Sequence, residues 1–173
     1  MDDMRGRRDK MLQDKEVARL RATYGDRLVR GIGSALKRDL LLADFNLALE
    51  TPFAVNWPER IEDADGLVLS YVSKVAAISV AECIDCRASL EAGLLGIYGN
   101  NYLGLCSVDN LKIVDLVEVA SSIEDAVVFY PKNTTGAIVV DCYPSNPGGM
   151  FSLFAQGGTL VDLLAECFTD GQV

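Results

Sequence analysis

The chain has 173 residues, half of them hydrophobic, and a formal net charge of −9. This length corresponds to one domain with a real hydrophobic core. No apolar run reaches the roughly 18 residues that a membrane-spanning helix needs, and the charged start Met1-Asp2-Asp3-Met4-Arg5 lacks the apolar stretch of a signal peptide. The composition therefore predicts a cytoplasmic protein with no membrane partner.

Charge is distributed unevenly along the chain. Residues 1–38 carry 11 Lys/Arg and 6 Asp/Glu, a net of +5, whereas residues 39–173 carry 5 and 19, a net of −14. An acidic body repels polyanions, so no nucleic-acid partner is expected. We predict a basic N-terminal helix or arm over residues 1–25 and a single α/β domain over residues 26–173. The arm is expected to pack on an acidic body, that of a second subunit in a homo-oligomer.

The first half of the chain alternates between helix and strand patterns. Residues 8–23 have a thin apolar stripe at helical spacing, and residues 26–30 predict a short strand that leads into Gly31-Ile32-Gly33-Ser34. Ser34 suits an N-cap for a helix over residues 35–50. The run 66–72 is almost entirely apolar, which is typical of a parallel strand buried on both faces.

The second half continues with one more helix–strand unit, in which residues 86–98 predict a helix and residues 102–106 a buried strand. Three further strands and a closing helix are then predicted, over residues 126–130, 137–143, 150–155 and 159–168. Because helix and strand alternate over the first two-thirds, we predict an α/β fold, an open parallel sheet flanked by helices of the flavodoxin or Rossmann type. An antiparallel C-terminal extension is left open.

Cysteine and histidine usage limits the chemistry. The odd number of five cysteines at irregular spacing does not indicate a disulfide framework, so we expect no disulfide. The motif Cys83-Ile84-Asp85-Cys86 is a single CxxC in a chain without histidine, so it does not complete a zinc site. We predict no metal and no cofactor. Without histidine, acid–base or covalent chemistry must come from carboxylates, Cys, Lys, Tyr or Ser, and the 25 acidic residues favour carboxylates.

Three carboxylates are the candidates for that chemistry. Asp65 lies at the head of the strand 66–72, Asp85 precedes the helix 86–98, and Glu91 has only apolar or small neighbours. In an open α/β sheet, ligands bind where the loops at the carboxyl ends of the strands converge. A carboxylate in an apolar segment is partly desolvated and so suited to chemistry. The alternative left open is a surface glutamate on an ordinary helix.

The sequence around these carboxylates resembles that of the nucleoside 2-deoxyribosyltransferase family. That family shows A-D followed by apolar residues and then D-x-G-small-x-x-E-x-G. Here the matching segments are Ala64-Asp65-Gly66-Leu67-Val68-Leu69 and Asp85-Cys86-Arg87-Ala88-Ser89-Leu90-Glu91-Ala92-Gly93. The resemblance extends over roughly residues 27–110. Arg87 stands where the family has glycine, and Asn100-Asn101 stand where it has Lys-Pro.

The resemblance implies an N-glycosidic enzyme that acts on a nucleoside or nucleotide by deoxyribosyl transfer or hydrolysis. Glu91 would be the carboxylate nucleophile, and Asp65 and Asp85 would assist the leaving base or bind the sugar. The implied substrate-binding residues are Gly31, Gly33, Ser34, Arg87, Ser89 and Gly93. Two rivals are left open: an acidic, non-catalytic binding module of the immunity-protein kind, and a degenerate family member that senses nucleotides.

Overall fold

The structure is a computed structural model of the chain, and it describes residues 2–52, 54–55, 66–99, 102–143 and 149–170. A seven-stranded sheet runs through it in the order β1-β4-β3-β5-β6-β7-β2. The strands are β1 (Phe45–Asn46), β2 (Gly66–Ser73), β3 (Gly93–Ile97), β4 (Leu105–Val108), β5 (Val127–Pro131), β6 (Ala137–Tyr143) and β7 (Met150–Gln156). The helices are α1 (Asp2–Leu36), the 3-10 turn η1 (Leu42–Asp44), α2 (Lys74–Arg87), α3 (Ile113–Ile123) and α4 (Gly158–Asp170).

The predicted open parallel sheet is wrong, because every pair of neighbouring strands in this sheet is antiparallel. Strands β3 and β4 are joined through residues 98–104, and β5 and β6 through residues 132–136. Such short connections join antiparallel neighbours, since parallel strands need a longer crossover. The apolar run in β2 does form a strand, but it pairs antiparallel with β7 at the edge of the sheet.

Several predicted elements change type. Residues 26–30 are not a strand, and the predicted helix over 35–50 is not formed, because α1 continues unbroken to Leu36. The predicted helix over 86–98 is replaced by the end of α2 and by β3. Gly93 and Gly96 lower helix propensity in that segment. The three C-terminal strands and the closing helix are confirmed as β5, β6, β7 and α4.

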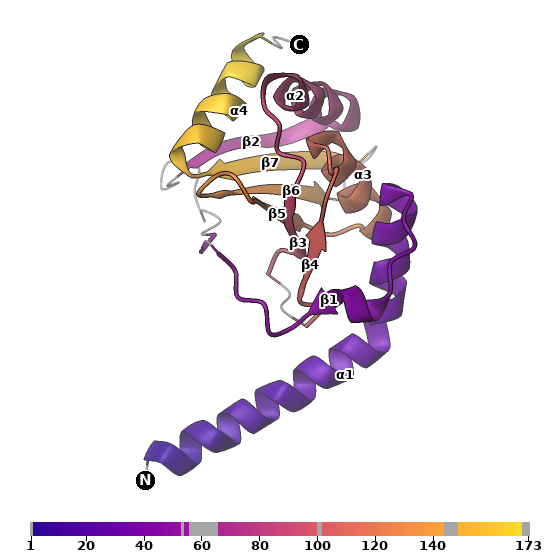
Figure 1. Cartoon of the computed structure of the whole chain (residues 1–173), viewed down its shortest axis with the longest axis vertical. Helices are drawn as coiled ribbons and strands as arrows, with labels where there is room; N and C mark the ends of the chain where they lie inside the picture. The colour runs from indigo at the N-terminus through magenta and orange to yellow at the C-terminus, as the bar shows by residue number, and fades with distance from the viewer. Residues whose placement is uncertain (1, 53, 56–65, 100–101, 144–148, 171–173) are drawn as a thin grey trace.

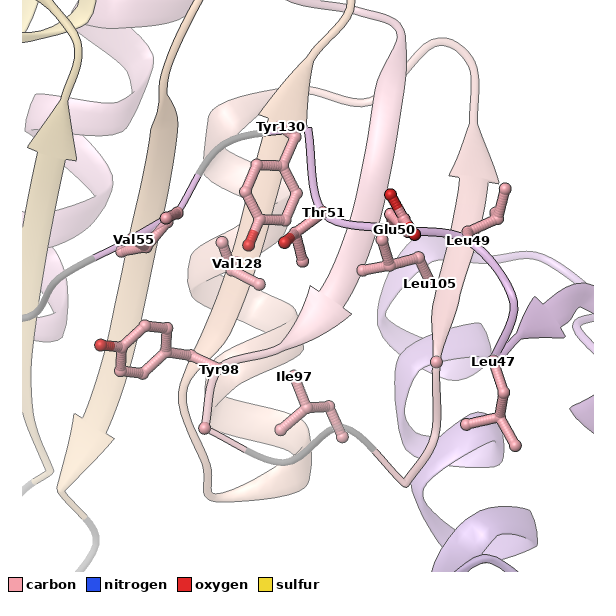
Figure 2. A pocket seen from close by; sticks show the side chains of 13 residues that line it. Leu47, Leu49, Glu50, Thr51, Val55, Ile97, Tyr98, Leu105, Val128 and Tyr130 are labelled. Carbon is pink, nitrogen blue, oxygen red and sulfur yellow. The ribbon is translucent and has the colours of Figure 1, made fainter. Parts of the chain in front are cut away.

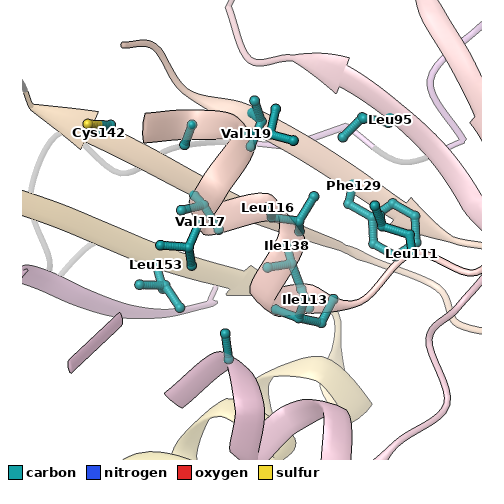
Figure 3. Close-up of a cluster of buried hydrophobic side chains, with 14 of the residues drawn as sticks. Leu95, Leu111, Ile113, Leu116, Val117, Val119, Phe129, Ile138, Cys142 and Leu153 are labelled. Carbon is teal, nitrogen blue, oxygen red and sulfur yellow. The ribbon is translucent and has the colours of Figure 1, made fainter. Parts of the chain in front are cut away.

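One face of the sheet is covered by helices (Figure 1). Alternate strand residues such as Phe129, Ile138 and Leu153 point to this face and are buried in one large cluster. Figure 3 shows Leu116 and Val117 of α3 packed over these strand side chains. Because α3 buries an almost complete apolar stripe here, this layer forms most of the hydrophobic core.

The opposite face of the sheet is apolar too. Val128, Val139 and Phe154 point there and are at most 3% exposed. Between β1 at one edge of the sheet and β2 at the other, the described residues 47–52 and 54–55 lie at this face. We call these residues the strap. Its Val55 packs on the second apolar cluster.

Helix α1 is 35 residues long, about 52 Å at 1.5 Å per residue. Its C-terminal part packs on α3 through buried Leu28 and Ile32. Arg21 joins the middle of α1 to η1 and β1, because its guanidinium donates to the carbonyls of Leu42 at 2.8 Å and Phe45 at 2.7 Å. The N-terminal half projects from the body (Figure 1), with Met11 more than half exposed. Packing of this arm on a second subunit stays a prediction.

A disulfide joins Cys83 of α2 to Cys167 of α4, with 5.6 Å between their Cα atoms. The expectation of no disulfide is therefore wrong. The two cysteines lie 84 residues apart, and only the packing of α4 on α2 brings them together. Cys86, Cys106 and Cys142 are free. None of the helices in the described part of the chain has the length and apolar character to span a bilayer.

We expect the Cys83–Cys167 bond to stabilise the fold by about 2–5 kcal/mol, because it closes a long loop in the unfolded chain. Cys167→Ser should lose this amount in urea denaturation without reductant, and wild type should lose it when dithiothreitol is added. Cys86→Ser, at a free and exposed cysteine, is the control and should match wild type. The prediction would be contradicted if dithiothreitol lowered the free energy of unfolding by the same amount in Cys167→Ser and in wild type.

Candidate functional site

A cavity of about 660 Å³ lies between the strap and the second face of the sheet. This volume is within the range of about 300–1,000 Å³ that is usual for small-molecule sites. The strap supplies one wall, and β3, β4 and β5 with their turns supply the other (Figure 2). The lining residues are Leu47, Leu49, Glu50, Thr51, Ala54, Val55, Ile97, Tyr98, Gly99, Gly104, Leu105, Val128 and Tyr130.

Strand alternation places two tyrosines at this cavity. Phe129 points into the helix-covered core, so its neighbours Val128 and Tyr130 point to the opposite face. Tyr98 follows β3 on that same face. Figure 2 shows Tyr130 from the sheet and Thr51 from the strap directed toward the same part of the cavity. Both walls therefore offer a hydroxyl to the cavity, beside aliphatic side chains such as Val128 and Leu105.

The Tyr130 hydroxyl is a neutral group at physiological pH. Tyr130 is only 5% exposed. Burial raises the pKa of its hydroxyl above the ordinary value, and the nearby Tyr98 raises it further. A protonated phenol both donates and accepts a hydrogen bond, so Tyr130 can bind either kind of polar atom without changing its charge.

The cavity disfavours anions. Among its described lining residues, Glu50 is charged and none is basic. The chain as a whole carries a net charge of −9, so a negatively charged ligand would be repelled on approach. Neutral or cationic molecules are the electrostatically suitable class.

Gly104 allows the strap to leave the sheet at this point. Its backbone has φ of +88°, and a Cβ there would lie 2.6 Å from the carbonyl carbon and oxygen of Asn46. The chain passes directly from Asn46 into the strap at Leu47. Any side chain at position 104 would therefore push this strand end and the strap away from the sheet.

A second cavity of about 500 Å³ adjoins the first at Tyr130. It is lined by Pro52, Ala92, Gly93, Leu94, Ser107, Val108, Asp109, Tyr130, Pro131, Lys132, Thr134, Thr135 and Gly136. Thr134 contributes a buried Oγ1 that has no hydrogen-bond partner in the described part of the chain. A buried unpaired hydroxyl costs about 1–3 kcal/mol, so a water or a polar ligand atom would be stabilised beside it.

Asp85, one of the predicted catalytic residues, holds the start of α3. Its Oδ1 accepts a hydrogen bond from the Ile113 amide at 2.7 Å, and its Oδ2 accepts one from the Val114 amide at 3.1 Å. Desolvation raises the pKa of the Asp85 carboxyl, and these two hydrogen bonds oppose the rise. Both carboxylate oxygens are thus occupied by backbone amides at a helix N-terminus.

Of the other two predicted catalytic residues, Glu91 is described by the structure, and it does not form a site with Asp85. Glu91 is exposed in the loop before β3, where its backbone carbonyl accepts from the Leu111 amide at 2.8 Å. Asp65 lies outside the described residues. Neither Asp85 nor Glu91 lines either cavity.

The residues predicted to form an anion-binding loop lie inside α1. A Cβ at Gly31 would lie 2.9 Å from a methyl carbon of Ile123, and one at Gly33 would lie 2.7 Å from the Arg38 carbonyl oxygen. These glycines therefore allow close packing of α1. Ser34 is exposed on the same helix.

The remaining predicted substrate-binding residues are dispersed. Arg87 makes an exposed ion pair with Glu166 at 3.0 Å, and Ser89 is exposed beside it in the chain. Gly93 does line the second cavity, and a Cβ there would lie 2.2 Å from the Tyr130 carbonyl oxygen. The sequence interpretation missed Tyr98, Thr51 and Tyr130. Alternation along β3 and β5 would have placed both tyrosines on the face opposite the helices.

No protein-family model, curated protein or solved structure matches this chain. The resemblance to the nucleoside 2-deoxyribosyltransferase family therefore stays a prediction.

Asp85→Ala should destabilise the fold by about 1 kcal/mol, because two amides at the start of α3 lose their acceptor. Chemical denaturation at pH 7 measures this loss. Glu82→Ala is the control on the same helix, since Glu82 is exposed, and it should change stability by less than about 0.5 kcal/mol.

The raised pKa of Asp85 determines how its contribution to the free energy of unfolding changes with pH. Its pKa in the fold is raised above about 3.9, the ordinary value in an unfolded chain. The part of its contribution to stability that depends on protonation is therefore present at low pH and is lost as the pH rises through the raised pKa, while its bonds to the two amides remain at pH 7. The unfolding free energy of wild type minus that of Asp85→Asn should thus decrease from pH 3 to pH 7. An increase over this range would contradict the direction of the shift.

Proposed function

We propose that this chain is a non-catalytic binding module that takes up a small, flat, mainly apolar molecule, neutral or cationic, in the cavity under the strap. The observation that carries the proposal is the cavity itself, with aliphatic side chains in walls from two separate segments and tyrosine hydroxyls in its lining. Ligand sites combine such walls with a few well-placed polar groups. Neutral aromatic molecules with one or two polar substituents belong to this ligand class.

The polar groups of the two cavities suggest how such a ligand would lie. Its flat body would contact Val128 and Leu105, which are buried on the sheet face. A polar substituent would bond to the hydroxyl of Tyr130 or Thr51. A longer ligand would extend past Tyr130 toward the unpartnered hydroxyl of Thr134.

The N-glycosidic enzyme remains the alternative proposal. In its favour, the raised pKa of Asp85 suits a group that donates a proton to a leaving base. The binding module is preferred, because Asp85 uses both oxygens to hold α3 and neither Asp85 nor Glu91 lines a described cavity.

Binding can be tested with two fluorescent probes that differ in charge. Neutral Nile red fits the proposed ligand class, and anionic anilinonaphthalene sulfonate does not. We expect Nile red to bind and the anionic probe to bind at least about tenfold more weakly. Ala54→Trp should weaken Nile red binding at least about tenfold, because an indole at this lining position fills the cavity. Ala48→Trp is the matched control, since Ala48 is an exposed strap residue outside the lining. Equal loss in both variants, or equal binding of both probes, would contradict the proposal.

Catalysis is tested separately by incubating the chain with each deoxynucleoside and a second free base, followed by chromatography. The binding module predicts no base release and no exchange above a blank. Exchange that is present in wild type and lost in Glu91→Gln would instead establish the enzyme, because the amide cannot form a glycosyl ester.

A further inference from the structure

Three cysteines come together where α2 and α4 meet. Cys83 is bonded to Cys167, which is only 1% exposed. Cys86 is free and exposed, three residues beyond Cys83 on α2. A solvent-accessible thiol therefore lies three residues from Cys83 on the same helix.

Helix geometry gives Cys83 two partners. Residues three apart in an α-helix lie on neighbouring positions of one side, with their Cα atoms about 5 Å apart. Disulfides bridge Cα separations of about 4.4–6.8 Å, and the bond to Cys167 spans 5.6 Å. Cys83 can thus be bonded to Cys86 or to Cys167, but not to both.

We propose that Cys83, Cys86 and Cys167 form a thiol–disulfide exchange site. Cys86 loses its proton to solvent, and its thiolate attacks Sγ of Cys83. A Cys83–Cys86 bond forms as the Cys83–Cys167 bond breaks, and the electron pair leaves on the Cys167 sulfur, which takes up a proton. One disulfide and one thiol are present before and after, so the step needs no oxidant or reductant.

The exchange changes what the disulfide connects. Before it, the covalent bond links α2 to α4, and after it, the bond lies within α2 alone. Helix α4 is then held by the packing of Leu160 and Leu164 and by the exposed Arg87–Glu166 ion pair. Small thiols and disulfides in solution would enter at Cys86, since that sulfur is exposed. This inference does not depend on a ligand in the cavity.

The test uses the full oxidised chain in a buffer of reduced and oxidised glutathione at pH 8. Samples are quenched with acid and N-ethylmaleimide, digested without reduction, and mapped by mass spectrometry. We expect the Cys83–Cys86 linkage to appear as Cys83–Cys167 declines, with maleimide on Cys167. In Cys86→Ser the Cys83–Cys167 bond should persist on the order of tenfold longer. Without the Cys86 thiol, glutathione must attack the partly shielded Cys83–Cys167 bond directly.

Cys106→Ser is the control, because Cys106 is a free cysteine in β4, away from α2 and α4, and it should follow the wild-type time course. Cys86→Ala serves as a second variant, and circular dichroism checks that both position-86 variants are folded. The proposal is overturned if no Cys83–Cys86 linkage appears in wild type, or if Cys83–Cys167 declines equally fast with and without Cys86.

Discussion

The structure depends on one constraint, which is that the central sheet is apolar on both of its faces. In β5, Phe129 points into the helix-covered core while Val128 and Tyr130 point the other way, and all three are buried. The two faces are covered differently. Helices α2, α3 and α4 contact strands of the sheet on one side, and the strap lies at the other. A sheet that left its second face in water would lose the free energy of burying that apolar surface.

The difference between the helices on one face of the sheet and the strap on the other explains where the cavity lies. A helix such as α3 presents a continuous apolar stripe and fills the space above the strands. The strap is a single segment without helix or strand in its described residues, so it encloses volume between itself and the sheet. The residues that line this volume are the ones that alternation turns away from the helices, among them Val128, Leu105 and Tyr130. The candidate site therefore follows from the way the second face is covered.

Local patterns predicted part of this fold. The strands β2, β5, β6 and β7 and the helix α4 could be recognised because their patterns are strong within single segments. Strand direction could not be predicted from the apolar run in β2, because such a run does not by itself show burial on both faces. In this edge strand only Leu69 is buried, and Tyr71 is exposed. Gly31 and Gly33 were interpreted as a loop, because only the contact of α1 with Ile123 and the Arg38 segment shows their packing role. The Cys83–Cys167 bond and the contact of Asp85 with α3 likewise depend on tertiary structure. The cavity was not predicted at all, because it is formed by segments from separate parts of the chain.

The central claim is that the cavity under the strap is a ligand site. The most direct test is a set of intermolecular nuclear Overhauser effects between the ring protons of bound Nile red and the methyl groups of the protein. Our proposal predicts such effects to the methyls of Val128 and Leu105, which line the cavity on the sheet side. Effects confined to methyls outside the cavity, such as those of the exposed Leu12 on α1, would contradict it.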